Sequence, residues 1–199
     1  GKKSFQGRTY RQDIDTHLEF QDRLWSPVLR RKRRMPTRYF LMGNHEDRIT
    51  RALEIQPELM GAIGLQDLNL SSWYNHIVFY NGNTPGVVEI DGIHYSHYMV
   101  PGNSTRPLSS EHHAYQLLVK YFKSCTVSHS HLLDHCIRTD AAGRKIHGLV
   151  AGCYLDYHPE WAGENAKNWW SGVIIKRNVE NGSYDPEFVS LNRLRKEYG

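Results

Sequence analysis

The stretch that decides the fold is Phe40-Leu41-Met42-Gly43-Asn44-His45-Glu46-Asp47-Arg48. Its apolar start, residues 39–42, is typical of a buried strand, and Gly43 then permits a tight turn into a polar helix start. The two acidic residues that follow suit the first turn of a helix, where the dipole favours negative charge. Because ligands of α/β proteins bind at the carboxyl ends of strands, we expect Asn44 and His45 to face a functional site.

The chemistry of these side chains indicates a metal site. Asn44 offers a neutral carbonyl oxygen to a cation, and His45 offers an imidazole that can donate a proton near neutral pH. A lone histidine, His97, ends another expected strand, and His129 and His131 follow further along the chain. If residues 129–131 are in a strand, both imidazoles point to one face; if the chain turns there, they can serve two adjacent metals.

These motifs occur in a family order. Gly43-Asn44-His45-Glu46, the lone His97 and Ser128-His129-Ser130-His131 resemble the last three signatures of the calcineurin-like metallophosphoesterases, which are Gly-Asn-His-Asp/Glu, a lone His and Gly-His-x-His. Ser128 stands where the family usually has Gly, and Tyr98 stands where Gly commonly follows the lone His. The resemblance spans most of the chain and implies an α/β fold: a two-sheet β-sandwich flanked by helices, with metals at strand ends.

The resemblance also implies a reaction, the hydrolysis of phosphomonoesters or phosphodiesters at a dinuclear centre of two divalent ions, with Mn, Fe or Zn plausible. Asn44, His97 and His129 would hold one ion, and His131 would bind the other. His45 would not be a ligand; it would stabilise the phosphoryl oxygens and protonate the leaving group. A looser similarity, of residues 148–154, is to small phosphoesterases of tailed bacteriophages.

The carboxylates of such a centre are missing from the expected places. The family draws them from Asp-x-His and Gly-Asp-x-x-Asp, upstream of Gly-Asn-His, and neither motif is evident. Asp15-Thr16-His17 matches Asp-x-His literally, but the periodicity of the surrounding apolar residues places it in the middle of a helix. We therefore expect the N-terminal strands to be missing, with Gly1 just past the Gly-Asp-x-x-Asp loop. An inactive phosphoesterase fragment is one alternative.

Composition sets broader bounds. The chain has 199 residues, 39% of them hydrophobic and 23% charged, which predicts one domain over 1–199. Three cysteines without a C-x-x-C pair suggest free thiols in a reducing, cytoplasmic compartment. No apolar run approaches the ~20 residues of a membrane span. The net charge of +4 is compatible with an anionic phosphate-ester substrate.

A basic run, Arg30 to Arg34, leaves a second alternative open. It can be a solvated helix C-terminus, where cations suit the dipole, or a surface that contacts phosphates of a nucleic acid or nucleotide. The second interpretation predicts a non-catalytic nucleic-acid-binding module, whose binding would depend steeply on salt and need no metal. No aromatic residue interleaves the run, which argues against single-strand stacking.

The remaining elements are expected from periodicity and turn residues. A helix over 10–29 should break or restart at Pro27. Asp91-Gly92 and Asn181-Gly182 should each close a β-hairpin. The other expected helices are 46–55 and 110–122, with a short helical turn within 57–63, and the expected strands are 38–42, 73–80, 87–90, 93–98, 125–128, 133–138, 145–152, 172–179 and 184–191.

Overall fold

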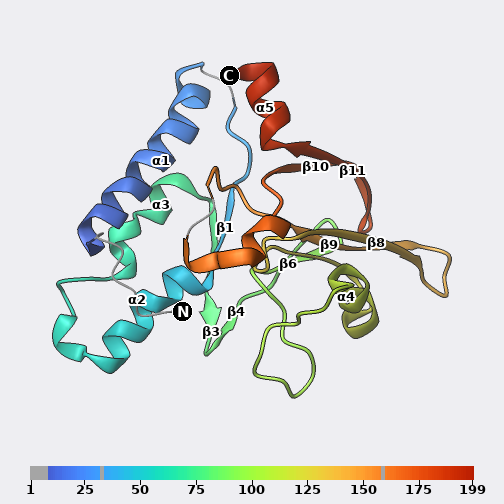
Figure 1. The fold of residues 1–199 in the computed structure, drawn as a ribbon, viewed down its shortest axis with the longest axis horizontal. Coiled ribbons are helices and arrows are strands. Elements are labelled where there is room, and N and C mark those ends of the chain that lie inside the picture. The colour runs from blue at the N-terminus through green and yellow to red at the C-terminus, as the bar shows by residue number, and fades with distance from the viewer. Residues whose placement is uncertain (1–8, 32–33, 158–159) are drawn as a thin grey trace. The chain divides into compact units, whose positions relative to one another are not determined.

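The computed structural model describes residues 9–31, 34–157 and 160–199, and the chain divides into two compact units, Gly1–Tyr80 and Asn81–Gly199 (Figure 1). Each unit combines helices and strands, so the expected mixed α/β class is confirmed. Whether the units fold as the single domain expected from the sequence stays a prediction. Within the described ranges, no helix is both long and apolar enough to cross a membrane.

The first unit begins with the helix α1 (Tyr10–Arg30), which a capping box starts at Thr9. The Thr9 backbone N–H donates to the Gln12 side chain at 2.9 Å, and the Gln12 N–H donates back to the Thr9 hydroxyl at 3.4 Å. The expected break at Pro27 is wrong, because the helix continues to Arg30. Pro27 lies in the last turn, where it removes the N–H that would donate to the Arg23 carbonyl and crowds that carbonyl, so the helix tolerates it only a few residues before its end.

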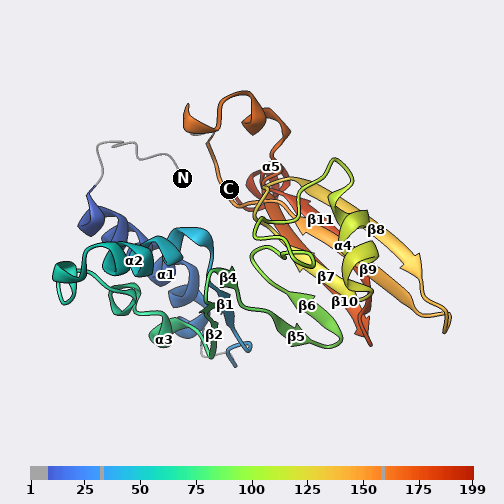
Figure 2. The ribbon, with the colours of Figure 1, turned by 90° about the horizontal axis from the view of Figure 1, so that it is seen from below.

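The rest of the first unit surrounds a pair of parallel strands. β1 (Tyr39–Leu41) pairs with β2 (His76–Val78), so the expected strand over 73–80 starts later than predicted. The intervening elements are α2 (Asn44–Ile55), the 3₁₀ turns Pro57–Leu59 and Leu65–Leu68, and α3 (Leu70–Trp73). Ile14, Leu68 and Leu70 form the buried core, with Phe40 and Ile49 packed against it. Figure 2 shows the three helices of this unit.

The second unit is built on a five-stranded mixed sheet in the order β5-β6-β7-β9-β8. Its strands are β5 (Val88–Ile90), β6 (Ile93–Tyr95), β7 (Ser124–Val127), β8 (Leu133–Thr139) and β9 (Lys145–Ala151). The three central strands are parallel and the two edge strands are antiparallel to them. The hairpin predicted at Asp91-Gly92 joins β5 to β6 and is confirmed. The short strands β3 (Tyr80–Asn81) and β4 (Thr84–Pro85) precede this sheet.

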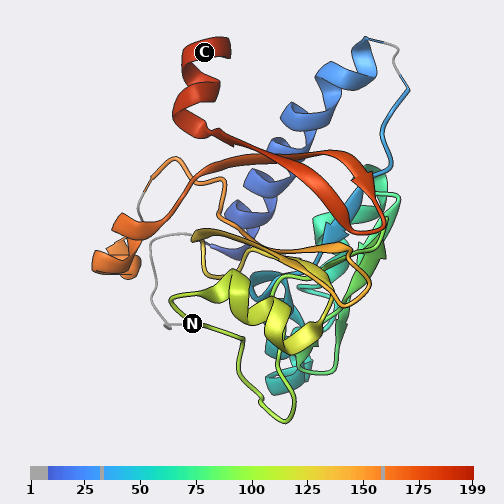
Figure 3. The same cartoon turned by 90° about the vertical axis from the view of Figure 1, so that its right-hand side faces the viewer.

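Both faces of the five-stranded sheet are covered (Figure 3). On one face lies α4 (His113–Tyr121), which connects β6 to β7 and is shorter than expected. On the other face lies a two-stranded hairpin, β10 (Gly172–Glu180) and β11 (Ser183–Ser190), whose predicted turn at Asn181-Gly182 is confirmed. The 3₁₀ segment Glu160–Asn168 precedes the hairpin, and α5 (Leu191–Tyr198) follows it.

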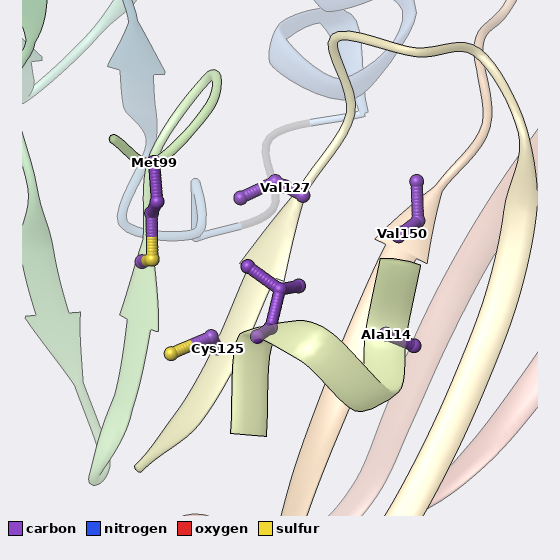
Figure 4. Close-up of a cluster of buried hydrophobic side chains, with 6 residues drawn as sticks. Met99, Ala114, Cys125, Val127 and Val150 are labelled. Carbon is purple, nitrogen blue, oxygen red and sulfur yellow. The ribbon is translucent and has the colours of Figure 1, made fainter. Parts of the chain in front are cut away.

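Each face has its own core. Between α4 and the sheet lie Met99, Ala114, Leu117, Cys125, Val127 and Val150 (Figure 4). Gly148 of β9 allows the close approach of α4, because a Cβ atom there would lie 2.0 Å from the Ala114 carbonyl oxygen. Between the hairpin and the sheet lie Ile93, Leu149 and Tyr184. The second unit is therefore layered as helix, sheet and hairpin.

Candidate functional site

The carboxyl ends of β6 and β7 bring two predicted site residues together. The strands are parallel neighbours, so His97 and His129 follow them at the same edge of the sheet. The pairing continues past the strands, since the Ser96 N–H donates to the Thr126 carbonyl at 3.2 Å. The Ser128 and His129 N–H groups then both donate to the His97 carbonyl, at 3.2 and 3.1 Å. This backbone arrangement fixes the two histidines side by side although they are 32 residues apart.

The two imidazoles face each other through nitrogen atoms. His129 Nδ1 lies 3.0 Å from His97 Nε2, and the ring planes are 74° apart. That separation suits a hydrogen bond between neutral rings. It also suits two ligands of one cation, because nitrogens bound at ~2.0–2.1 Å and about a right angle apart would be roughly 3.0 Å from each other. The donor chemistry therefore fits a borderline divalent ion such as zinc or manganese.

His97 is positioned differently from the expectation. β6 ends at Tyr95, so the predicted strand over 93–98 is too long and His97 lies in the segment after it. The alternation of strand faces therefore does not decide its direction; the hydrogen bonds to its carbonyl do. Tyr98 follows, and its ring centroid lies 5.0 Å from that of His129 and 5.7 Å from that of His97. The tyrosine thus packs beside both imidazoles.

His131 lies in a turn rather than in a strand. β7 ends at Val127, and the His131 N–H donates to the Ser128 carbonyl at 3.0 Å, which closes the turn. His131 has a φ of 62°, in the left-handed region, so the strand alternative for 129–131 is wrong and the turn alternative applies. The His131 ring packs against the Trp169 ring in a T-shaped arrangement, with the two centroids 4.3 Å apart. The structure therefore directs His129 and His131 to different neighbours.

Asn44 and His45 occupy the first two positions of α2 in the first unit. The Glu46 carboxylate accepts a hydrogen bond of 2.8 Å from the Gly43 N–H, which fixes the turn between β1 and the helix. The His45 side chain is solvent-exposed overall, and partial desolvation followed by the charge of Arg48 lowers its pKa below the ordinary value of 6.5. The expected convergence of Asn44 with the three histidines stays a prediction.

Among the described residues, no carboxylate joins the histidine pair in a group that could hold a metal. Across residues 9–31, 34–157 and 160–199, no three His, Cys, Asp or Glu side chains form a group that could hold a metal. Asp15-Thr16-His17 lies in the middle of α1, as predicted. His17 Nε2 there is 3.1 Å from the Leu68 carbonyl, so this histidine fixes α1 to its own unit. The site in the second unit thus has two nitrogen donors.

Sequence reasoning missed a group of buried and partly buried polar side chains on the hairpin face of the sheet. His135 and His147 were expected only to lie on a hairpin, yet His135 Nε2 lies 3.2 Å from His147 Nδ1. Lys176 of β10 reaches into the same layer and donates to Thr126 at 2.6 Å. Alternation along β10 could have indicated an inward Lys176, since it falls two residues from the packed Ile174. No motif marks these residues.

Comparison of the chain with protein-family models, with curated proteins and with solved structures found no match.

Proposed function

We propose that the chain binds a divalent cation through His97 and His129 and hydrolyses phosphomonoesters or phosphodiesters. The observation that carries the proposal is the 3.0 Å approach of His97 Nε2 and His129 Nδ1 at the carboxyl edge of parallel strands. A hydrogen-bonded histidine pair inside a core would serve packing alone. These two rings instead lie past the strand ends and are half-buried, a placement that is typical of ligand sites in α/β proteins.

The residues have separate roles in this proposal. A bound divalent ion supplies Lewis acidity and a nucleophilic water of lowered pKa. His97 and His129 hold it as neutral imidazoles, and Tyr98 restricts the rotation of both rings by packing against them. Asn44 as a further ligand, His131 as a ligand of a second ion and His45 as the proton donor to the leaving oxygen are parts of the same proposal. Water molecules would complete the coordination of the ion.

The first experiment measures metal binding and hydrolysis together. Wild-type chain, His129→Ala and His112→Ala are loaded with Mn²⁺ or Zn²⁺, and bound metal and turnover of bis-(p-nitrophenyl) phosphate are measured. His112 is an exposed histidine at the start of α4 and serves as the matched control. We expect His129→Ala to lose both metal and activity and the control to keep both. Metal bound without hydrolysis would instead support an inactive phosphoesterase fragment.

The second experiment separates the roles of Asn44 and His45. His45→Ala should lower turnover by ~10²–10⁴-fold, the usual contribution of a general acid, while bound metal stays unchanged. Asn44→Ala should lower metal occupancy, and excess metal should restore part of the activity. Equal loss of metal in both variants would make His45 a ligand. Metal-independent binding of nucleic acid with a steep salt dependence would favour the alternative function, whose basic run includes residues 32–33, outside the described residues.

A further inference from the structure

A cavity lies on the α4 face of the five-stranded sheet. α4 has nine residues and packs against β7, β8 and β9. The part of the same face that carries His94 of β6 and Cys125 of β7 is covered instead by residues 84–87 and by the loop 98–104. A partly open cavity of about 520 Å³ lies between these segments and the sheet. All residues that line this cavity belong to the second unit.

The walls of the cavity suit an aromatic or otherwise apolar group. Pro85, Val87 and Met99 contribute aliphatic surface, and Tyr98 and Tyr121 contribute rings. In Figure 4, Met99 and Cys125 lie on the opposite side of the core cluster from Ala114 and Val150. A volume of this size is within the ~300–1,000 Å³ typical of small-molecule sites, which are mostly apolar with a few polar groups.

Two polar atoms at the cavity lack a hydrogen bond inside the described part of the chain, although the other ring nitrogen of His94 pairs with Glu89 at 3.4 Å. The Tyr121 hydroxyl and His94 Nδ1 are both buried, and neither has a hydrogen bond there. Leaving such a buried polar group unpaired is unfavourable, so a ligand that pairs with one of them gains affinity. Lys123 adds a positive charge at the wall. Burial raises the pKa of the Cys125 thiol to about 12, so this cysteine acts as an apolar wall residue.

The cavity adjoins the candidate metal site. Tyr98 lines the cavity, and the same ring packs beside His129 and His97. Tyr98 is thus shared by the cavity and the histidine pair. A phosphate ester matches this pair of neighbouring sites, because it joins a compact charged phosphate, suited to a metal ion, to an organic group, suited to the cavity.

We propose that this cavity binds the organic group of the substrate and selects phosphate esters of an aromatic heterocycle with hydrogen-bonding edges, of nucleoside size. The ring stacks among Tyr98, Met99 and Tyr121, and its polar edge pairs with the Tyr121 hydroxyl or His94 Nδ1. This inference rests on the proposed phosphoesterase function and adds the substrate class to it.

The test compares two esters that share one leaving group. Metal-loaded full chain is assayed with thymidine 5′-(p-nitrophenyl phosphate) and with methyl p-nitrophenyl phosphate. We expect kcat/KM to favour the nucleoside ester by about tenfold or more, since a pocket that holds an added apolar group commonly discriminates by that amount. Val87→Trp, which places an indole at the cavity wall, should reduce the preference about tenfold. The matched control Ile137→Trp, at an exposed position of β8, should leave the preference unchanged.

Each outcome decides between the two proposals. Equal kcat/KM values for the two esters in the wild type, or a preference that Val87→Trp leaves intact, would overturn the substrate class and keep the phosphoesterase. No metal-dependent hydrolysis of either ester would overturn the proposed function. In that case NMR titration with thymidine tests the cavity directly: saturable shifts at Tyr98 and Tyr121 that Val87→Trp removes support it, and their absence at millimolar thymidine overturns it.

Discussion

The two faces of the five-stranded sheet are covered by different chemistry. Under α4 the core is apolar, with Leu117, Val127 and Val150 almost completely buried. Under the hairpin β10–β11 the apolar residues share the layer with a lysine, two histidines and two tyrosines. Both faces are buried, so burial alone does not require an apolar core. Several polar groups of this layer find partners within it, whereas His147 Nε2 and the Tyr184 hydroxyl are buried without a hydrogen bond among the described residues.

Lys176 is the centre of the hairpin face. Its ammonium donates to the Tyr95 hydroxyl at 3.0 Å and to the Thr126 hydroxyl at 2.6 Å. It also lies 4.1 Å from the ring centroid of Tyr95 and 4.8 Å from that of Tyr184. Cation–π contacts and hydroxyl groups offset part of the desolvation of the charge. No carboxylate is among these contacts, and burial lowers the pKa of Lys176 to about 7.

The histidines of this face are held in the neutral form. His147 is almost completely buried, and burial, followed by the nearby His135, lowers its pKa to about 4. Its ring lies against Tyr184 at a centroid distance of 4.2 Å. The hairpin face therefore holds a histidine pair and a lysine, whereas the α4 face is filled by apolar side chains beside a buried histidine, His113. The following predictions test this difference, beginning with the largest expected effect.

Gly148→Ala should strongly destabilise the second unit. The new Cβ would meet the Ala114 carbonyl oxygen at 2.0 Å and the Leu118 side chain at 3.1 Å, so α4 has to move away from the sheet. Overpacking of a core costs ~1–3 kcal/mol and occasionally more, and a backbone clash belongs at the upper end. Urea unfolding followed by circular dichroism measures the loss.

The control for this change is Gly143→Ala. Gly143 lies in the turn between β8 and β9, with nothing within 4 Å of an added Cβ but a φ of +78°. We expect only the ~1–2 kcal/mol cost of a left-handed residue that has a Cβ. Equal losses at the two positions would show that α4 does not depend on close approach at Gly148.

Lys176→Met should change the pH dependence of stability. In the unfolded chain Lys176 keeps its proton up to its ordinary pKa of 10.5, whereas the folded protein releases it near pH 7. Between these values the unfolded state binds more protons, so wild-type stability rises with pH, by up to ~1.4 kcal/mol per pH unit for one group. Methionine has no titrating group, so this rise should be absent when unfolding is measured from pH 7 to 10.

The lower pH range provides the internal control for this variant. The folded pKa of His147 is lowered to about 4 from 6.5, so stability also rises from about pH 4 to 6.5. That rise should persist in Lys176→Met, because His147 and His135 remain. The other titrating group that contacts the Lys176 ammonium through a hydrogen bond, Tyr95, has its pKa raised to about 12 and stays protonated in this window. A variant that keeps the wild-type slope above pH 7 would contradict the assignment.

Ser124→Ala should have the most local effect and report the link between sheet and hairpin. The buried Ser124 hydroxyl donates to the Gly182 carbonyl at 2.6 Å and accepts from the His147 N–H at 3.0 Å. Its removal leaves two buried backbone groups unpaired, at ~1–3 kcal/mol in total if the layer relaxes around them. Hydrogen exchange should increase first at the β10–β11 turn. Increased exchange confined to α4 would contradict this link.

Local signals in the sequence predicted much of the fold. The turns at Asp91-Gly92 and Asn181-Gly182, the strand before Gly43 and the paired strands over 133–138 and 145–152 all depend on neighbouring residues, and all are confirmed. The roles assigned to Asn44, His45 and His131 follow from motif order and stay predictions. The sequence also indicated His97 and His129 as partners through the same order.

The tertiary structure decided what depends on pairing between distant segments. The 3.0 Å approach of His97 and His129 requires β6 and β7 to be parallel neighbours, and the direction of His97 is set by hydrogen bonds to its carbonyl beyond the strand. Pro27 stays helical because of where α1 ends, and Lys176 is buried because two tyrosine rings and a threonine hydroxyl surround it. Periodicity reports which side chains prefer burial, but partners that come from other strands are determined only when the chain has folded.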